Sequence, residues 1–502
     1  MPPTPPELDF LLIGAGISGI GVACHLARGC PDKRFVILEQ RERLGGTWDL
    51  FRYPGIRCDS DMCSFGYAFH PWPSDAIITG GESIREYLRE TAEAYGVDRA
   101  IRYGHHVTRA SWSSERARWT VRAEVDGPDG RTEHIFRARF LVMCPGYFSY
   151  ERGFKPDIAG LDDFAGEVLH PQFWPEGFDY AGKRVVVIGS GATAVTIVPA
   201  LAKGGADVTM LQRSPTYYLS LPDVDRTVAL ARKVLPSDLV TRTALVRNTL
   251  TQLALYKACR RFPRAARAVL LAQVRKRLGG KVDMRHFTPR YDPWDERLCV
   301  VPNGDLFEVL RDGRATIVTD EIERVAPDGV LLRSGERLDA DVLVTATGLD
   351  VRLFGGVHVE VDGEAVDPSE RPLYKAAMID GVPNFATIFG YANSSWTRKV
   401  DAVGPYLCRL ARHMDRTGAE VAVPEGGARF ISDDPFFPLK SGYAKRATAL
   451  LPKQGERLPW RTTNNAALDY LMLRLGSLRD GHLAFRPARA PRPQPARDQL
   501  AA

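Results

Sequence analysis

Short apolar runs that end at glycine-rich turns divide much of the chain into repeated strand, turn and helix units. The first run ends at Ile13 and precedes small and apolar residues at helical spacing, and a second run, FVIL, ends just before Glu39. A later series starts with VVVI before Gly189 and closes with a run that ends at Leu211. Short strands that alternate with helices predict parallel sheets built from βαβ units. We therefore expect an α/β fold.

Between residues 216 and 290 the pattern changes, because apolar residues recur at spacings of three and four in three successive segments. This periodicity predicts helices, which Pro236 and Pro263 should separate. Strand-like runs return afterwards, and one of them leads into ATG at residues 346–348. The sequence thus predicts a helical insert within the second βαβ series.

The first turn, GAGISG, has the glycine spacing of a dinucleotide-binding motif. Gly14 makes the turn, Gly16 lets a pyrophosphate approach the backbone, and Gly19 lets the helix pack on the strand. Glu39 follows twenty residues after Gly19, where a carboxylate accepts hydrogen bonds from ribose hydroxyls. A carboxylate there suits an adenosine with a free 2′-hydroxyl, as in FAD or NAD.

The second turn, GSGATA, repeats this design with Gly189, Gly191 and Ala194. Alanine at the third position is an accepted variant of the motif. The strand that follows ends on Gln212 and Arg213 instead of a carboxylate. Because an arginine at this point accommodates a 2′-phosphate, the second site is predicted to prefer NADPH to NADH.

The segment between the two turns, FAGEVLHPQFWP, has the composition of a tight linker, and Gly166 is expected to allow a positive φ there. Its spacing, however, resembles the fingerprint FxGxxxHxxxWP of the Baeyer–Villiger monooxygenases, which are class B flavoprotein monooxygenases. The defined positions are occupied by Phe164, Gly166, His170, Trp174 and Pro175.

The resemblance extends to LGGTWDLF and RYPGIRCDSD, which contain Gly46, Thr47, Trp48 and Asp59. In the family these segments wrap the flavin, and the acid that Asp59 matches lies beside an active-site arginine. Arg297, just after PWDE, matches that arginine by context. His170 and Trp174 would couple motion of the nicotinamide domain to the flavin side. On composition alone, Asp59 and Arg297 could equally be solvated side chains.

The resemblance implies two Rossmann-like dinucleotide-binding domains, one for FAD and one for NADPH, with the helical insert in the NADPH domain. Thr347 and Gly348 are expected beside the cofactors where the chain crosses back to the FAD domain. Residues 389–396 should contact the flavin ring, and Trp460 should face the substrate pocket. The expected boundaries are 1–150 and 351–485 for the FAD domain, 151–215 and 297–350 for the NADPH domain, 216–296 for the insert and 486–502 for a disordered tail.

The implied reaction inserts one oxygen atom of O2 into a ketone to give an ester or lactone, with thioethers and thioamides as further substrates. A flavin monooxygenase that oxidises sulfur or nitrogen is the nearest alternative, although such enzymes have a shorter fingerprint without Trp174 and Pro175. A dithiol reductase is a remote alternative, since Cys58 and Cys63 come ten residues later than the redox pair of those enzymes. Glu296 replaces a lysine that many family members have near the 2′-phosphate, which implies modest coenzyme discrimination.

Composition narrows the remaining possibilities. The sequence has no run of 18 apolar residues and no secretory signal at its start, so we expect a cytoplasmic protein without a membrane span. Its eight cysteines include no CxxC pair, which favours reduced thiols over a metal site or a disulfide framework. The oligomeric state stays open.

The net charge of +6 is unevenly distributed, because residues 226–281 contain fourteen Lys or Arg side chains and a single acid. Three interpretations are open: a solvated basic face, contact with an acidic subunit surface, or a peripheral contact with a membrane surface through basic amphipathic helices. Nucleic acid is disfavoured as a partner, because no recognised binding motif accompanies the charge.

Overall fold

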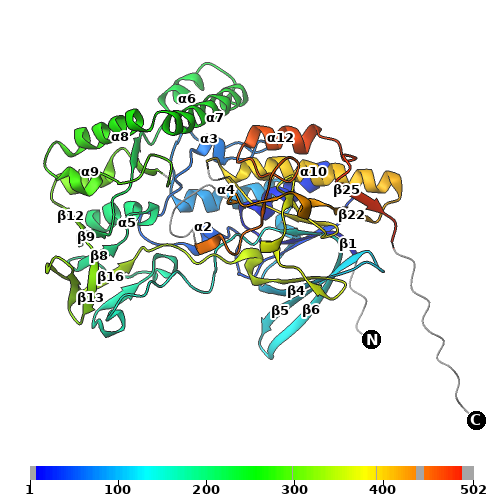
Figure 1. The fold of residues 1–502 in the computed structure, drawn as a ribbon, viewed down its shortest axis with the longest axis horizontal. Coiled ribbons are helices and arrows are strands. Elements are labelled where there is room, and N and C mark those ends of the chain that lie inside the picture. The colour runs from blue at the N-terminus through cyan, green and yellow to red at the C-terminus, as the bar shows by residue number, and fades with distance from the viewer. Residues whose placement is uncertain (1–6, 297, 392, 437–445, 489–502) are drawn as a thin grey trace, which may run out of the picture.

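The structure is a computed structural model that describes residues 7–296, 298–391, 393–436 and 446–488. Two β-sheets lie towards opposite ends of its longest axis, and helices pack on both (Figure 1). The predicted α/β fold class is confirmed.

The first sheet joins a parallel part to an antiparallel part through one long strand, β6. The parallel strands run in the order β21–β6–β1–β2–β3, and the other end of β6 pairs with β5, which pairs with β4. Two further strands, β17 and β18, extend this edge from much later in the chain. The bounds are β1 Glu7–Ile13, β2 Phe35–Leu38, β3 Ile101–Arg102, β4 His105–Ser113, β5 Arg118–Gly127, β6 Gly130–Met143, β17 His358–Val361, β18 Glu364–Ala365 and β21 Phe385–Thr387.

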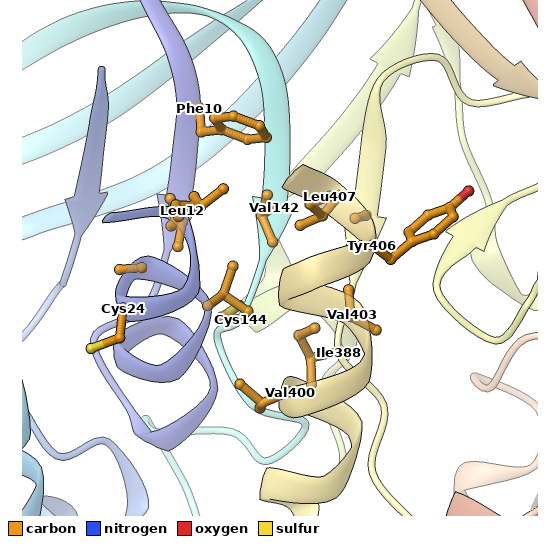
Figure 2. Packing of buried hydrophobic residues seen from close by; sticks show 14 of the residues in the cluster. Phe10, Leu12, Cys24, Val142, Cys144, Ile388, Val400, Val403, Tyr406 and Leu407 are labelled. Atoms are coloured by element: carbon orange, nitrogen blue, oxygen red, sulfur yellow. The ribbon is translucent and has the colours of Figure 1, made fainter. Parts of the chain in front are cut away.

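Helices α1 (Ile17–Gly29) and α10 (Trp396–Thr417) pack against each other beside this sheet. Figure 2 shows side chains of β1, β6, α1 and α10 gathered in one apolar layer, all of them buried. The two helices approach closely because glycines lie at their contact. A Cβ on Gly21 would lie 2.6 Å from Val400, and one on Gly404 would lie 2.6 Å from His25. Close packing therefore binds the first and last thirds of the chain into one core.

The second sheet is wholly parallel, with the order β12–β9–β8–β16–β7. Its strands are β7 Glu167–Leu169, β8 Arg184–Ile188, β9 Asp207–Gln212, β12 Ala315–Thr319 and β16 Val342–Thr345, and it is accompanied by α5 Ala192–Lys203 and α9 Asp305–Arg311. A small antiparallel sheet packs at its side, formed by β13 Ile322–Ala326, β14 Gly329–Leu332 and β15 Arg337–Asp339. Both predicted βαβ series are thus present, each in its own sheet.

The insert contains three helices: α6 Arg226–Ala231, α7 Ser237–Arg261 and α8 Pro263–Leu278. Pro236 precedes α7 and Pro263 begins α8, as predicted. The prediction of helix from residue 216 onward was wrong at its start, because β10 (Tyr218–Leu221) is a strand. It pairs in parallel with β11 (Cys299–Pro302), a partner 81 residues away that local periodicity does not reveal.

The remaining elements are short or lie around the first sheet. The last strand, β25 (Leu483–Arg486), corrects the expected start of the C-terminal tail at residue 486. Arg486, placed in the tail from sequence, belongs to β25 and pairs with Val421; residues 489–502 lie outside the described part. These elements are α2 Thr47–Leu50, α3 Met62–Phe65, α4 Gly81–Ala94, α12 Ala466–Leu475, β19 Leu373–Tyr374, β20 Met378–Ile379, β22 Val421–Pro424, β23 Ile431–Ser432, β24 Gln454–Gly455, β25 Leu483–Arg486, and the 3-10 turns Asp98–Ala100, Leu161–Asp163, Pro171–Phe173, Met284–Phe287, Leu353–Gly356, Pro368–Glu370 and Gly427–Phe430.

Residues 51–57 belong to the first half of the chain but pack with the second sheet. Phe51 and Tyr53 are buried in the hydrophobic cluster of β8, β9, β16 and α5. Gly55 has a φ of +78°, and a Cβ there would lie 2.8 Å from Ala200 of α5. Arg57 forms a two-pronged ion pair with Asp305 at the start of α9. This segment, which we call the anchor segment, fixes one sheet relative to the other.

Gly166 of the fingerprint is required for a different reason from the one predicted. Its φ is not positive, so the expectation of a left-handed turn was wrong. A Cβ at this position would lie 2.3 Å from the carbonyl oxygen of Asp341 and 2.8 Å from the ring of Phe164. Close approach of the backbone just before β16, where it pairs with β7, therefore excludes any side chain.

The described residues contain neither a membrane-spanning helix nor a metal-binding cluster. Among the described helices, none is long and apolar enough to cross a membrane. Within the same residues, no group of three or more His, Cys, Asp or Glu side chains could hold a metal ion.

We predict that Gly166→Ala lowers the free energy of unfolding by about 1–3 kcal/mol, because the added methyl group overpacks against a backbone carbonyl that cannot move away. Urea unfolding monitored by tryptophan fluorescence measures the change. Gly127→Ala is the matched control, since its Cβ would make only an ordinary contact at 3.5 Å. Equal stability of both variants would contradict the close approach at Gly166.

Candidate functional site

A cavity of about 320 Å³ opens at the carboxyl ends of β1 and β6. This is the point where the order of the parallel strands reverses, since β2 lies on one side of β1 and β6 on the other. Ligands of open α/β sheets bind in such crevices. The walls come from residues 13, 14, 16–18, 38–40, 45–48, 58–60, 65, 105–107, 144–151, 352, 354, 355, 357 and 394–396.

The first glycine-rich turn forms the floor of this cavity. Gly14 has a φ of +98°, and a Cβ there would lie 2.5 Å from the carbonyl oxygen of Cys144. A Cβ on Gly19 would lie 1.9 Å from the carbonyl oxygen of Gly14, so this glycine lets α1 start directly against the turn. Gly46 has a φ of +57°, and a Cβ there would lie 3.0 Å from the Cα of Gly16. The bare backbone fits a pyrophosphate.

Glu39 is a buried residue of the cavity wall and is held by the backbone. Its carboxylate accepts the N–H of Ala15 at 2.7 Å and the N–H of Arg41 at 2.9 Å. Burial raises the pKa of Glu39, and these two hydrogen bonds oppose the rise. The fixed carboxylate retains lone pairs for ribose hydroxyls. Residues 105–107 also line the cavity, and the sequence did not predict them. They begin strand β4 and carry no motif that would have indicated a binding site.

Residues expected around a flavin ring also line the cavity. Trp48, Asp59, Ser394, Ser395 and Trp396 all line it. Trp48 meets Phe65 edge-on at 6.0 Å, and Trp396 stacks on Tyr147 at 4.9 Å. Asp59 is exposed on the cavity wall. Arg297 lies outside the described residues, so its pairing with Asp59 stays a prediction.

The second glycine-rich turn lies at the corresponding point of the second sheet, at the carboxyl end of β8 between β9 and β16. Gly189 has a φ of +145°, and a Cβ there would lie 2.4 Å from the carbonyl oxygen of Ala346. Gly191 caps α5 and faces open space, and Ala194 is buried behind it. Arg213, just after β9, is exposed and makes no ion pair with any described residue. The turn and the arginine fit a dinucleotide with a 2′-phosphate.

His170 connects the fingerprint to the crossing between the two sheets. Its Nδ1 accepts the N–H of Gln172 at 3.2 Å, which places the proton on Nε2, and Nε2 donates to the carbonyl of Gly348 at 3.2 Å. Burial lowers the pKa of His170, so the ring stays neutral at pH 7. Gln172 in turn donates to the carbonyl of Ser149, which lines the cavity.

Several predicted site residues lie outside the cavity wall. Thr347 donates to the carbonyl of Phe154 at 3.2 Å, and Gly348 accepts from His170, so both hold the crossing together. Their contact with a cofactor stays a prediction. Trp174 packs edge-on against Phe178 at 5.8 Å.

Trp460 does not face a pocket, so that expectation was wrong. It is fully buried and packs against Tyr374 at 5.5 Å and His482 at 5.8 Å. A Cβ on either Gly427 or Gly455 would clash with it, which shows how closely the surrounding loops enclose the ring.

The cysteine pair lacks the features of a redox dithiol. Neither Cys58 nor Cys63 forms a disulfide, and the Cys63 thiol donates to the carbonyl of Thr241 at 3.6 Å. Burial raises the pKa of Cys63 to about 11. Redox-active cysteines instead have lowered pKa values, because the thiolate is the reactive form.

Comparison with known proteins agrees with this geometry. A family model described as flavin-binding monooxygenase-like matches residues 10–229. The putative FAD-containing monooxygenase MymA of Mycobacterium tuberculosis is 49% identical over 96% of this chain and 98% of its own length. The probable FAD-binding monooxygenase AlmA of Acinetobacter baylyi is 47% identical over 95% and 96%. The FAD-containing monooxygenase EthA of M. tuberculosis is 46% identical over 97% and 99%. The chain belongs to this family of flavin monooxygenases.

Solved structures share the fold of this monooxygenase. A steroid monooxygenase bound to NADP is similar with a TM-score of 0.76 and 21% identity, and covers 96% of this chain and 100% of its own. A cyclohexanone monooxygenase bound to ε-caprolactone is similar with a TM-score of 0.74 and 20% identity over the same shares. The predicted flavin-dependent monooxygenase with two Rossmann-like units is confirmed, and the dithiol reductase alternative is not supported.

We predict that Gly14→Ala purifies without FAD, because its methyl group would strain a φ of +98° and overlap the Cys144 carbonyl. The ratio of flavin absorbance to protein absorbance measures occupancy. Gly191→Ala, where a Cβ meets open space, is the matched control and should stay yellow. A Gly14→Ala protein with full FAD occupancy would show that this turn does not hold the cofactor.

Proposed function

We propose that this monooxygenase holds FAD in the cavity and NADPH at the second turn, and inserts one oxygen atom of O2 into ketones to give esters or lactones. Thioethers and thioamides are proposed as further substrates. The observation that carries the proposal is the chain of contacts from Gly348 through His170 and Gln172 to Ser149. It links the fingerprint and the second sheet to the wall of the cavity, as coupled use of two nucleotides requires.

The proposed domain boundaries follow the two sheets. Residues 1–150 and 351–486 form the FAD domain, with the second part extended to Arg486 because that residue belongs to β25. The pairing of β17 with β4 and of β21 with β6 supports this division. Residues 151–215 and 297–350 form the NADPH domain, and residues 216–296 form the insert.

Each site residue has a proposed role in this chemistry. FAD, when bound, would supply the redox chemistry: two electrons from NADPH reduce O2, one oxygen atom enters the substrate and the other leaves as water. Glu39 binds the ribose of FAD, and Arg213 binds the 2′-phosphate of NADPH. Arg297 stabilises the negative charge that develops on the substrate carbonyl oxygen, and Asp59 orients its guanidinium. His170 positions the crossing and has no role as an acid, since its ring is neutral and both nitrogens are engaged.

The test is NADPH-dependent oxygen uptake by the purified yellow protein with a panel of cyclic ketones and thioethers, followed by mass spectrometry. Ester or lactone formation is the expected result. Sulfoxide from thioethers without ester from any ketone would overturn the proposal in favour of a heteroatom monooxygenase.

Arg213→Ala should raise the KM for NADPH while leaving the KM for NADH nearly unchanged. Loss of a charged hydrogen bond to the 2′-phosphate corresponds to roughly 1.5–3 kcal/mol in kcat/KM. Steady-state kinetics with both coenzymes measure the change, and Arg324→Ala, an exposed arginine on β13, is the control. Equal losses with both coenzymes would show that Arg213 does not contact the phosphate.

Arg297→Ala should abolish ester formation while FAD stays bound, because the charge on the reacting oxygen loses its counterion. Arg297→Lys should restore only part of the rate, since lysine lacks the planar fork that binds a carboxylate and a second oxygen together. Asp59→Ala should give a smaller loss. Product analysis with a good ketone substrate measures all three, with Arg290→Ala as the control. Ester formation by Arg297→Ala at the wild-type rate would refute the assignment.

A further inference from the structure

The helical insert exposes an unusual concentration of large apolar side chains. Of the 19 that the described part of the chain exposes, eight fall within residues 226–281. Of these eight side chains, Leu230, Val234 and Val269 are the most exposed, at 66%, 78% and 69%. A solvated helix face is normally polar, so a purely solvated basic face does not account for this surface.

The exposed apolar side chains of α7 form one stripe. Leu239, Val246 and Leu250 are spaced by seven and four residues, which places them on the same side of a helix. The opposite side of α7 is already used, because Val240 and Ala244 are buried. One apolar face of α7 therefore packs against the rest of the protein, and a second apolar face is exposed to solvent.

Cations surround this stripe. Of the fourteen Lys and Arg side chains in residues 226–281, three pair with carboxylates among the described residues: Arg232 with Asp75, Arg247 with Asp225 and Arg260 with Asp295. Arg242 and Lys257 on α7 and Lys276 on α8 are exposed and have no acidic partner there. We call this region, the outer side of α6, α7 and α8, the basic-apolar surface.

The basic-apolar surface points away from both sheets. Figure 1 shows α6, α7 and α8 along the upper edge of the molecule, beyond α5 and α9. The insert is held in that place by the hydrogen bond from Asn248 to Asp61, by the Arg232–Asp75 ion pair and by a backbone bridge between Ala76 and Val224. The surface thus has a fixed direction relative to the cavity, whose wall includes Asp59 and Ser60.

Charge selects among the possible occupants. Two copies of this chain that met through the surface would bring two strongly positive regions together, which disfavours self-association. Nucleic acid would use aromatic side chains for stacking, and Phe262 is the only exposed aromatic residue among the described residues of the insert. An anionic bilayer satisfies both features, because its headgroups attract the cations and its interface takes up apolar side chains.

We propose that the basic-apolar surface docks the enzyme peripherally on an anionic lipid bilayer, with the α7 stripe inserted at the headgroup level and the unpaired cations against the headgroups. Apolar ketones and thioethers concentrate in such bilayers, so docking places the enzyme where its substrates collect. The membrane contact itself does not depend on the reaction proposed above.

The experiment is co-sedimentation of the FAD-loaded enzyme with vesicles of phosphatidylcholine alone or mixed equally with phosphatidylglycerol. Binding to the mixed vesicles is expected at about 0.1 M salt and release at about 0.5 M, because salt screens surface charge. The triple variant Arg242→Gln, Lys257→Gln, Lys276→Gln should bind roughly fivefold more weakly per cation removed. The triple variant Leu239→Ser, Val246→Ser, Leu250→Ser, which removes the α7 stripe, should lose binding as well.

Matched controls change the same chemistry elsewhere on the surface. Arg99→Gln, Arg116→Gln, Arg324→Gln removes three exposed cations, and Ile135→Ser, Ile431→Ser, Leu450→Ser removes three exposed apolar side chains. Both controls should bind as the wild type does. Flavin content and NADPH oxidation report that every variant is folded.

Three results would overturn the proposal. The first is absence of binding to the mixed vesicles, and the second is equal binding to neutral ones. The third is concentration-dependent self-association that the serine variant abolishes in analytical ultracentrifugation, since the surface would then join copies of the chain.

Discussion

The placement of the two sheets depends on the anchor segment, residues 51–57. Burial of one large side chain contributes about 1.5–3 kcal/mol, so Phe51 and Tyr53 together contribute a sizeable share of the 5–15 kcal/mol that is roughly typical of a whole domain. Arg57 adds a directional contact with Asp305, and Gly55 admits α5 at van der Waals distance. The anchor segment leads directly into Cys58 and Asp59 on the cavity wall. A shift of the second sheet would therefore move this part of the cavity wall.

The same contact recurs at both nucleotide turns. In each, the first glycine rests on the carbonyl that ends the strand across the reversal point: Gly14 on Cys144 and Gly189 on Ala346. A positive φ and the absence of Cβ are both needed, so no other residue fits without strain. Ala346 also begins the crossing that His170 and Thr347 hold through Gly348 and Phe154. The second glycine-rich turn and the crossing consequently share one stretch of backbone, which is consistent with the place of the fingerprint between the two motifs.

The sequence predicted the features that depend on neighbours in the chain. Glycine spacing, the strands before each turn, the position of Glu39 and the prolines that separate the insert helices all follow from local patterns. Features that depend on distant partners escaped it. β10 is a strand because β11 pairs with it, Gly166 is bare because Asp341 approaches it, and Trp460 is buried because loops from Tyr374 and His482 enclose it. An indole has the same sequence signature in a core as in a pocket.

The insert shows the same limit for charge. A count of fourteen cations in residues 226–281 is compatible with a solvated face, a subunit contact or a membrane contact, because composition does not say which side of a helix the apolar residues occupy. The structure separates the two sides of α7: Val240 and Ala244 face the protein, and the stripe from Leu239 to Leu250 faces outward. The cations around this stripe include Arg242 and Lys257, which pair with no acid among the described side chains. Asn248, in the same helix, is hydrogen-bonded to Asp61, two residues after Asp59 on the cavity wall. A partner bound to the outer side of α7 would therefore also restrain the loop that contains Asp59.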